Sequence, residues 1–332
     1  MDGPVNRRQV LLGSGALLMP APALAARAAL RIPAGGGPLP PEWTAAETIA
    51  LWAAAPPGAP VTPPVRSATL DPAFITGVAR PELRVFRPAQ SKSNGRALLV
   101  IPGGAYTFIS IRNEGTDVAR VMTARGYTVF VLVYRLPGEG WANRSDVPLQ
   151  DAQRAMRVIR FGAAGFGIDP ATVAVLGFSA GGHLAASLIT AAAEPVYAPR
   201  DAADALDARP CCAGLIYPVI AATPPHTHLL SAQRLLGPQP TEEAIVRRSP
   251  ARHVDMATPP TFLVHAIDDE AVPYENTMLF IDALRAARRP AELHLFEEGG
   301  HGFGIGPVNA PAGQWPALFA AFLDRHGSQL AA

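Results

Sequence analysis

The stretch that decides the fold is Val173-Ala-Val-Leu-Gly177-Phe-Ser179-Ala-Gly181-Gly-His183. Its first part is a continuous apolar run, which predicts a strand buried on both faces, and the small residues that follow predict a helix over 182–193. Between them lies a G-x-S-x-G turn, so tight that small residues are needed on either side of the serine, whose hydroxyl then stands above the sheet. The pattern predicts a nucleophile at Ser179. An ordinary turn with a capping serine is the alternative.

Apolar runs and helical patterns alternate along the rest of the chain. Together with the strand at 173–178, six further strands are predicted, at 82–87, 97–101, 128–134, 214–219, 261–266 and 292–296. Helices predicted at 147–160 and 274–289 supply crossovers. The sequence therefore predicts one α/β domain with a mostly parallel central sheet and helices on both faces. Segments 193–209 and 222–250 are expected to cap the site and to hold substrate choice.

Composition supports a globular enzyme of this size. The 332 residues are 49% hydrophobic and 17% charged, which excludes a disordered or fibrous chain. The formal net charge is +1, and no Lys/Arg cluster in the globular part predicts nucleic-acid binding. The two cysteines, Cys211 and Cys212, are adjacent and provide no disulfide framework. They are expected to pack at the start of a strand, with a reactive or metal-binding thiol as the alternative.

The first 25 residues have the composition of a signal peptide. Arg7-Arg8 precede an uncharged run over 9–26 that includes Ala23-Leu24-Ala25. The paired arginines favour the twin-arginine route over a plain secretory signal, so we expect export to the bacterial periplasm or beyond. Because the run is short and broken by glycines and prolines, no stable membrane insertion is expected after processing. Residues 26–70 are expected to form an extended Pro/Gly-rich lead-in with a short helical pattern around 45–51, followed by a catalytic domain over 71–328.

A serine hydroxyl is a poor nucleophile at neutral pH and needs a histidine base, which in this kind of fold comes later in the chain. His301 lies in a glycine-rich loop after the last predicted strand, where an imidazole can reach the serine. His183, His265 and His294 are expected to be structural. A metal pair at 226 and 228 is the remaining alternative, but acidic or cysteine ligands are not nearby, so no metal site is predicted.

Two aspartates compete to orient that histidine. Asp268 and Asp269 both follow the strand predicted at 261–266. Asp269 is preferred because loops of this type commonly place the acid three residues before a Val-Pro pair, here Val272-Pro273. Asp268 stays open as the acid, or as a carboxylate that caps a helix or faces solvent.

The tetrahedral intermediate of acyl transfer also needs amide donors. The loop after the strand at 97–101 is Gly-Gly-Ala-Tyr, so Gly104 and Ala105, together with Ala180, are the predicted oxyanion donors. A plain turn is the alternative. Tyr106 and Trp141 could offer stacking surface to a sugar or could each pack a loop.

Taken together, these motifs resemble the α/β-hydrolase superfamily, and within it the bacterial acetyl xylan esterases and related carbohydrate esterases. The resemblance covers roughly Glu47 to the C-terminus. It is carried by the stretches 101–106, 134–141, 148–154, 177–183, 265–273 and 299–303. The family often has glycine where Ala105 stands, so this chain departs from the pattern at one predicted oxyanion donor.

The resemblance implies a serine esterase that works through Ser179, His301 and Asp269 and an acyl-enzyme, without metal or cofactor. Acetyl esters of xylan, xylo-oligosaccharides or other sugars are the implied substrates. A serine peptidase of the prolyl oligopeptidase type has similar spacings, although its usual propeller domain has no counterpart in these residues. An inactive binding protein on the same fold is a third reading. The motifs leave acyl chain length, alcohol portion and oligomeric state open.

Overall fold

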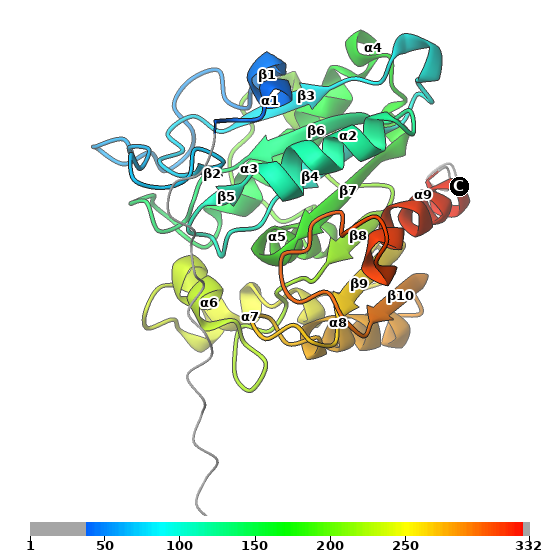
Figure 1. The fold of residues 1–332 in the computed structure, drawn as a ribbon. Coiled ribbons are helices and arrows are strands. Elements are labelled where there is room, and N and C mark those ends of the chain that lie inside the picture. The colour runs from blue at the N-terminus through cyan, green and yellow to red at the C-terminus, as the bar shows by residue number, and fades with distance from the viewer. Residues whose placement is uncertain (1–37, 328–332) are drawn as a thin grey trace, which may run out of the picture.

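The computed structural model describes residues 38–327 and contains an eight-stranded sheet in the order β1-β3-β6-β4-β7-β8-β9-β10 (Figure 1). The strands are β1 Glu47–Ala50, β3 Glu82–Phe86, β4 Ala97–Ile101, β6 Thr128–Val133, β7 Val173–Phe178, β8 Ala213–Ile216, β9 Thr261–Ala266 and β10 Ala291–Phe296. All neighbours from β6 to β10 are parallel, whereas β3 is antiparallel to both β1 and β6. The predicted fold class and all seven predicted strands are confirmed.

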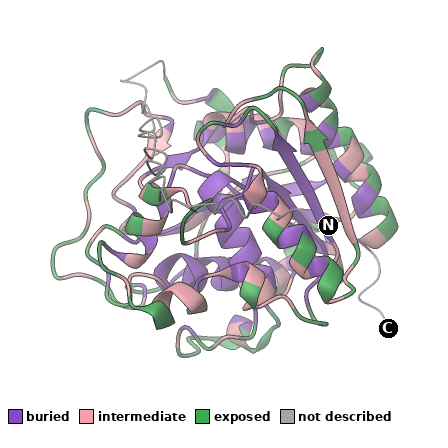
Figure 2. Cartoon of the chain, turned by 90° about the horizontal axis from the view of Figure 1, so that it is seen from below, coloured by how far each residue is buried: buried purple, intermediate pink, exposed green. Residues whose placement is uncertain are grey.

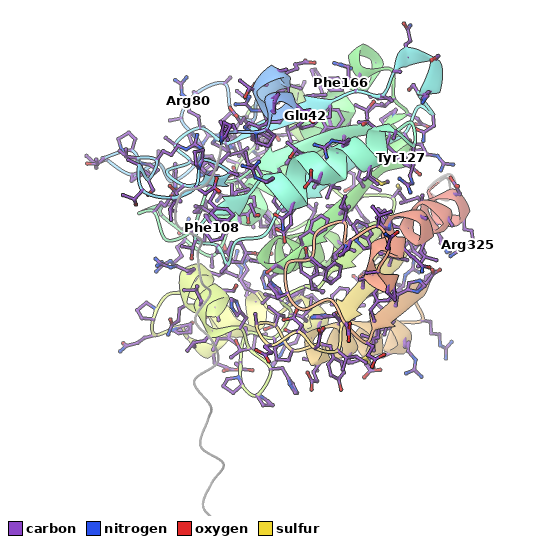
Figure 3. The ribbon with its side chains drawn as sticks, viewed as in Figure 1. Glu42, Arg80, Phe108, Tyr127, Phe166 and Arg325 are labelled. Atoms are coloured by element: carbon purple, nitrogen blue, oxygen red, sulfur yellow. The ribbon has the colours of Figure 1, made fainter. Side chains whose placement is uncertain are left out.

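Helices cover both faces of this sheet. They include α2 Asp117–Thr123, α3 Val147–Phe161, α5 Ser179–Thr190, α8 Glu275–Ala286 and α9 Trp315–His326. In Figure 1, α2 and α9 lie in front of the sheet, and α3, α5 and α8 lie behind it. The central strands β4, β6, β7, β8 and β9 are buried at every residue, as Figure 2 shows in purple. Side chains fill the space between the layers (Figure 3), which explains why these strands read as unbroken apolar runs.

The N-terminal part of the described chain differs from the expectation. The helix α1 ends at Ala45, and Glu47–Ala50 form strand β1 instead of the expected helical turn around 45–51. β-branched Thr48 and Ile49 pair with β3, and Leu51 and Trp52 are buried immediately after them. The sheet therefore begins ahead of residue 71, where the sequence placed the start of the catalytic domain. The predicted signal peptide lies outside the described residues.

The remaining segments lie at the ends of the strands. A small antiparallel pair, β2 Phe74–Ile75 and β5 Ile109–Ser110, was not foreseen. The segment 222–250 contains α6 Leu229–Leu236 and α7 Glu242–Arg247, and 193–209 contains a single 3-10 turn, Ala202–Ala205. The two cysteines are buried directly ahead of β8. Over residues 38–327, no helix combines the length and apolar character needed to cross a bilayer.

Candidate active site

Ser179 occupies the turn between β7 and α5 in a left-handed conformation, with φ of +51°. Both flanking glycines are sterically required. A Cβ on Gly177 would lie 2.4 Å from the carbonyl oxygen of Gly181, and one on Gly181 would lie 2.2 Å from that of Ile101. The chain therefore approaches itself more closely than any larger residue allows, as a nucleophile elbow requires.

The structure brings the three predicted triad side chains into one hydrogen-bonded chain. The Ser179 Oγ lies 2.8 Å from the His301 Nε2, and the His301 Nδ1 lies 2.7 Å from an Asp269 carboxylate oxygen. They come from the ends of β7, β10 and β9, which meet at one edge because these strands are parallel. With Nδ1–H donating to the carboxylate, Nε2 can accept the serine proton. The arrangement can generate a nucleophile.

The two competing aspartates have different surroundings. Asp269 is buried, and its second oxygen accepts hydrogen bonds from the amides of Ala271 and Val272 at 2.9 and 2.8 Å. Burial alone would raise the pKa of Asp269, but hydrogen bonds from His265 and His301 hold that pKa well below its usual range. Asp268 is exposed, and its carboxylate accepts the Gly300 N–H at 2.8 Å. Asp269 thus orients the histidine, and Asp268 fastens the loop that carries it.

The loop expected to bind the oxyanion lies against the nucleophile. A Cβ on Gly103 would lie 2.8 Å from the Ser179 Cβ. Gly104 has φ of +124° and Ala105 has φ of +54°, so the alanine adopts the left-handed conformation in which glycine is more usual. Among the turn and loop hydrogen bonds of residues 38–327, none is donated by the amides of Gly104, Ala105 or Ala180. These three amides remain the candidate donors to an oxyanion.

Two aromatic residues, Tyr106 and Trp141, are buried against other protein groups and do not offer a surface on which a sugar could stack. Tyr106 is 1% exposed, and its hydroxyl donates to the His183 Nδ1 at 2.9 Å. The His183 Nε2 in turn donates to the Arg248 carbonyl at 2.9 Å, and burial lowers the pKa of His183 to about 4, so the ring is neutral. Trp141 is 5% exposed and lies beneath the guanidinium of Arg135, 4.9 Å from its ring centre. Of the two readings, the structure supports loop packing.

Three other histidines have hydrogen-bond partners outside the Ser179–His301 pair. His265 is buried, bonded through Nδ1 to the Thr277 hydroxyl at 2.7 Å and through Nε2 to Asp269 at 3.2 Å, so it supports the triad acid. His294 pairs with Glu292, and His228 lies 2.8 Å from the Ser231 hydroxyl. Within the described part of the chain, no three His, Cys, Asp or Glu side chains are grouped to bind a metal ion.

Sequence reasoning missed Glu114 and Tyr217. Glu114 lies in the helical turn Arg112–Thr116, buried, where its carboxylate accepts the Gly103 N–H at 2.7 Å and the Tyr217 hydroxyl at 2.9 Å. The Tyr217 oxygen accepts the Gly304 N–H at 3.0 Å. Burial raises the pKa of Glu114, although both hydrogen bonds oppose it. Because the pair is separated by 103 residues, no local pattern reveals it.

Known families match this chain in two parts. Residues 83–202 match the BD-FAE family, and residues 212–329 match the prolyl oligopeptidase family. Among curated relatives, endo-1,4-beta-xylanase B of Butyrivibrio fibrisolvens is 36% identical over 63% of this chain, and an acetylxylan esterase of Xylanibacter ruminicola is 31% identical over 64%. The match spans only 32% and 42% of those two longer proteins.

A solved structure matches over nearly its whole length. The acetyl ester-xyloside bifunctional hydrolase of Caldicellulosiruptor lactoaceticus is 33% identical, with a TM-score of 0.71, over 84% of this chain and 96% of that one. The sheet order, the turn at Ser179 and this structural match all indicate the same fold. The chain belongs to the α/β-hydrolase superfamily.

Proposed function

We propose that this protein is a serine esterase that hydrolyses short-chain acyl esters, in particular acetyl esters of xylan, xylo-oligosaccharides or related sugars. The observation that carries the proposal is the hydrogen-bonded chain from Asp269 through His301 to Ser179 at the elbow, with interatomic distances of 2.7 and 2.8 Å. Acyl transfer needs this combination of nucleophile, base and orienting acid.

In the proposed reaction, the Ser179 oxygen attacks the ester carbonyl while the His301 Nε2 takes its proton. Asp269 keeps the imidazole in the correct tautomer and stabilises the imidazolium. The oxyanion receives hydrogen bonds from Ala180 and the Gly104–Ala105 loop, each contributing about 3 to 4 kcal/mol to lowering the barrier. The imidazolium then protonates the departing alcohol. Water, activated by the same histidine, releases the acyl group.

The short acyl group is proposed from two relatives whose names refer to acetylxylan or to an acetyl ester.

The alcohol portion of the natural ester substrate is also proposed from the relatives. Two of them carry names that refer to acetylated xylan or to acetyl esters and xylosides, and one of these is matched along nearly its full length. A peptidase is the second candidate, favoured by the match of residues 212–329 to the prolyl oligopeptidase family. Release of amines from peptide substrates would distinguish it.

The test is acetate release from acetylated xylo-oligosaccharides by protein that begins near Ala26, compared with Ser179→Ala. We expect release by the wild type and loss of release in the variant. If neither releases acetate but the wild type cleaves p-nitrophenyl acetate, the esterase remains and the sugar substrate is wrong. Failure to cleave both substrates or to react with a fluorophosphonate would contradict the esterase itself.

A further inference from the structure

We infer that Glu114, acting with Tyr217, is a positioning residue that joins the oxyanion loop to the histidine loop and supplies a second negative charge facing the His301 imidazolium. The inference rests on the proposed esterase reaction. It starts from three hydrogen bonds that run from Gly304 through Tyr217 and Glu114 to Gly103.

The donors in this chain define where its protons lie. The Gly304 N–H can only donate, so the Tyr217 oxygen accepts it and turns its own hydrogen toward Glu114. The Gly103 N–H can also only donate, and it binds the other carboxylate oxygen. Both oxygens of Glu114 therefore accept hydrogen bonds, and these favour the ionised carboxylate against the burial that raises its pKa.

The same chain of hydrogen bonds passes beside the catalytic imidazole. The Tyr217 ring packs edge-on against His301, with ring centres 5.0 Å apart, and against Phe303 on the same loop at 4.6 Å. His301 is also one of the groups that lower the pKa of Glu114 against the effect of burial. Tyr134 and Tyr217 are the other titratable groups that face Glu114, and Asp269 is the other charged group facing His301.

Basic side chains do not neutralise either carboxylate. In the part of the chain that the structure describes, no arginine or lysine forms an ion pair with Glu114 or Asp269. Arg112, on the same helical turn as Glu114, instead donates to the Pro38 carbonyl and lies 4.0 Å from Asp71. A positive charge therefore arises next to these carboxylates when His301 takes the serine proton.

This arrangement favours the transition state over the free enzyme. A buried carboxylate is costly while the imidazole is neutral, and its interaction becomes favourable as the imidazolium forms. Because Glu114 also binds the Gly103 amide, it keeps the loop in the conformation that leaves the following amides of Gly104 and Ala105 free for the oxyanion. One side chain thus acts on both charges of the tetrahedral intermediate. Its own charge stabilises the imidazolium, and its hydrogen bond to Gly103 holds the loop that binds the oxyanion.

The decisive variant is Glu114→Gln, which keeps the side-chain length and removes the charge. We expect kcat to fall about tenfold and the acid limb of the kcat/KM profile to move about one unit to lower pH, because an imidazole without the nearby anion protonates less readily. The matched control is Glu139→Gln. Glu139 also caps two amides, those of Gly77 and Val78, but it belongs to a different loop. Neither kcat nor the acid limb should change in it.

A second variant separates charge from anchoring. Tyr217→Phe loses the hydrogen bonds to Gly304 and Glu114 but retains the carboxylate, so we expect a fall in kcat with little movement of the acid limb. If Glu114→Gln lowers kcat without moving the acid limb, the charge role is refuted. If it changes neither quantity, the whole inference is refuted.

A readout independent of turnover keeps this inference separable from the proposed function. The pH at which the His301 imidazole gains its proton can be followed by NMR in Ser179→Ala, with His301→Gln to assign the signal. Adding Glu114→Gln should lower that pH by about one unit. A shift in this background together with a wild-type protein that cleaves no ester would remove the esterase proposal and leave the coupling between Glu114 and His301 standing; no shift would overturn the coupling.

Discussion

Two of the buried polar clusters in residues 38–327 arrange their charges in different ways. The paired cluster consists of Arg135, Asp151, Gln150 and Trp52. In it the guanidinium and the carboxylate are both fully buried and 2.8 Å apart, and the Trp52 indole donates to the same carboxylate. The site cluster consists of Ser179, His301, Asp269, Glu114 and Tyr217. There one carboxylate is hydrogen-bonded to the imidazole, and the other is linked to it through Tyr217.

The difference separates a structural network from a reactive one. The paired cluster places a guanidinium and a carboxylate in direct contact, and it joins the N-terminal lead-in to the sheet, because Arg135 also donates to the Pro57 carbonyl at 2.6 Å. The site cluster contains two carboxylates that no arginine or lysine of residues 38–327 pairs with, and a cation forms in it when His301 takes the serine proton. A cluster that pairs cation and anion in the resting state stabilises the fold, whereas one in which a cation forms during the reaction stabilises the transition state.

The largest effect should come from Asp269→Asn. Losing the carboxylate leaves the imidazole in the wrong tautomer and its charge unsupported, so we expect kcat to fall about 10,000-fold. The free energy of unfolding should change much less than in the paired cluster. Hydrolysis of p-nitrophenyl acetate and urea denaturation measure the two quantities. Activity within tenfold of wild type would remove the distinction between the clusters.

Asp151→Asn is the matching change in the paired cluster. It leaves the buried Arg135 guanidinium without its counter-charge, and we expect the free energy of unfolding to fall by about 3 to 5 kcal/mol. The folded fraction should keep its kcat. Urea denaturation followed by circular dichroism, with activity normalised to folded protein, checks both points. A large loss of kcat in fully folded protein would contradict a purely structural role.

His183 sharpens the comparison because it is a buried polar group without charge. Its folded pKa of about 4 lies below the value of 6.5 for an unfolded chain. Between these values the unfolded chain binds a proton that the folded protein does not, so stability falls as pH falls from 6.5 to 4, by about 3 kcal/mol. Below that window the loss levels off. Urea denaturation across pH should show a smaller slope for His183→Gln, and an unchanged slope would assign the effect to other groups.

The smallest effect is expected for Asp268→Asn. This exposed side chain can still accept the Gly300 N–H as an amide, so only the charge contribution to that hydrogen bond is lost. We expect kcat to fall less than about fivefold, equivalent to less than about 1 kcal/mol. Assays beside Asp269→Asn decide between the adjacent aspartates. A loss as large as that of Asp269→Asn would reverse their assignment.

Much of the fold follows from local pattern. Strands such as β4 and β7 are buried on both faces, so their sequences are apolar throughout and their bounds were predicted to the residue. β1 was missed because it is a largely exposed edge strand of four residues, without an apolar run. β8 was predicted too long because the chain leaves the strand at Tyr217, where φ is +38°. A tyrosine side chain gives no indication of that backbone conformation.

The sequence by itself predicted the elbow at Ser179, His301 as the candidate base and Asp269 as the preferred acid, because each lies in a short motif whose spacing is imposed by local backbone geometry. Only the tertiary structure decided the separate roles of the adjacent aspartates, the burial of Tyr106 and the place of Glu114. The physical reason is that hydrogen bonding and desolvation depend on neighbours brought together by the sheet, here from positions 103 residues apart, and no local pattern records such neighbours.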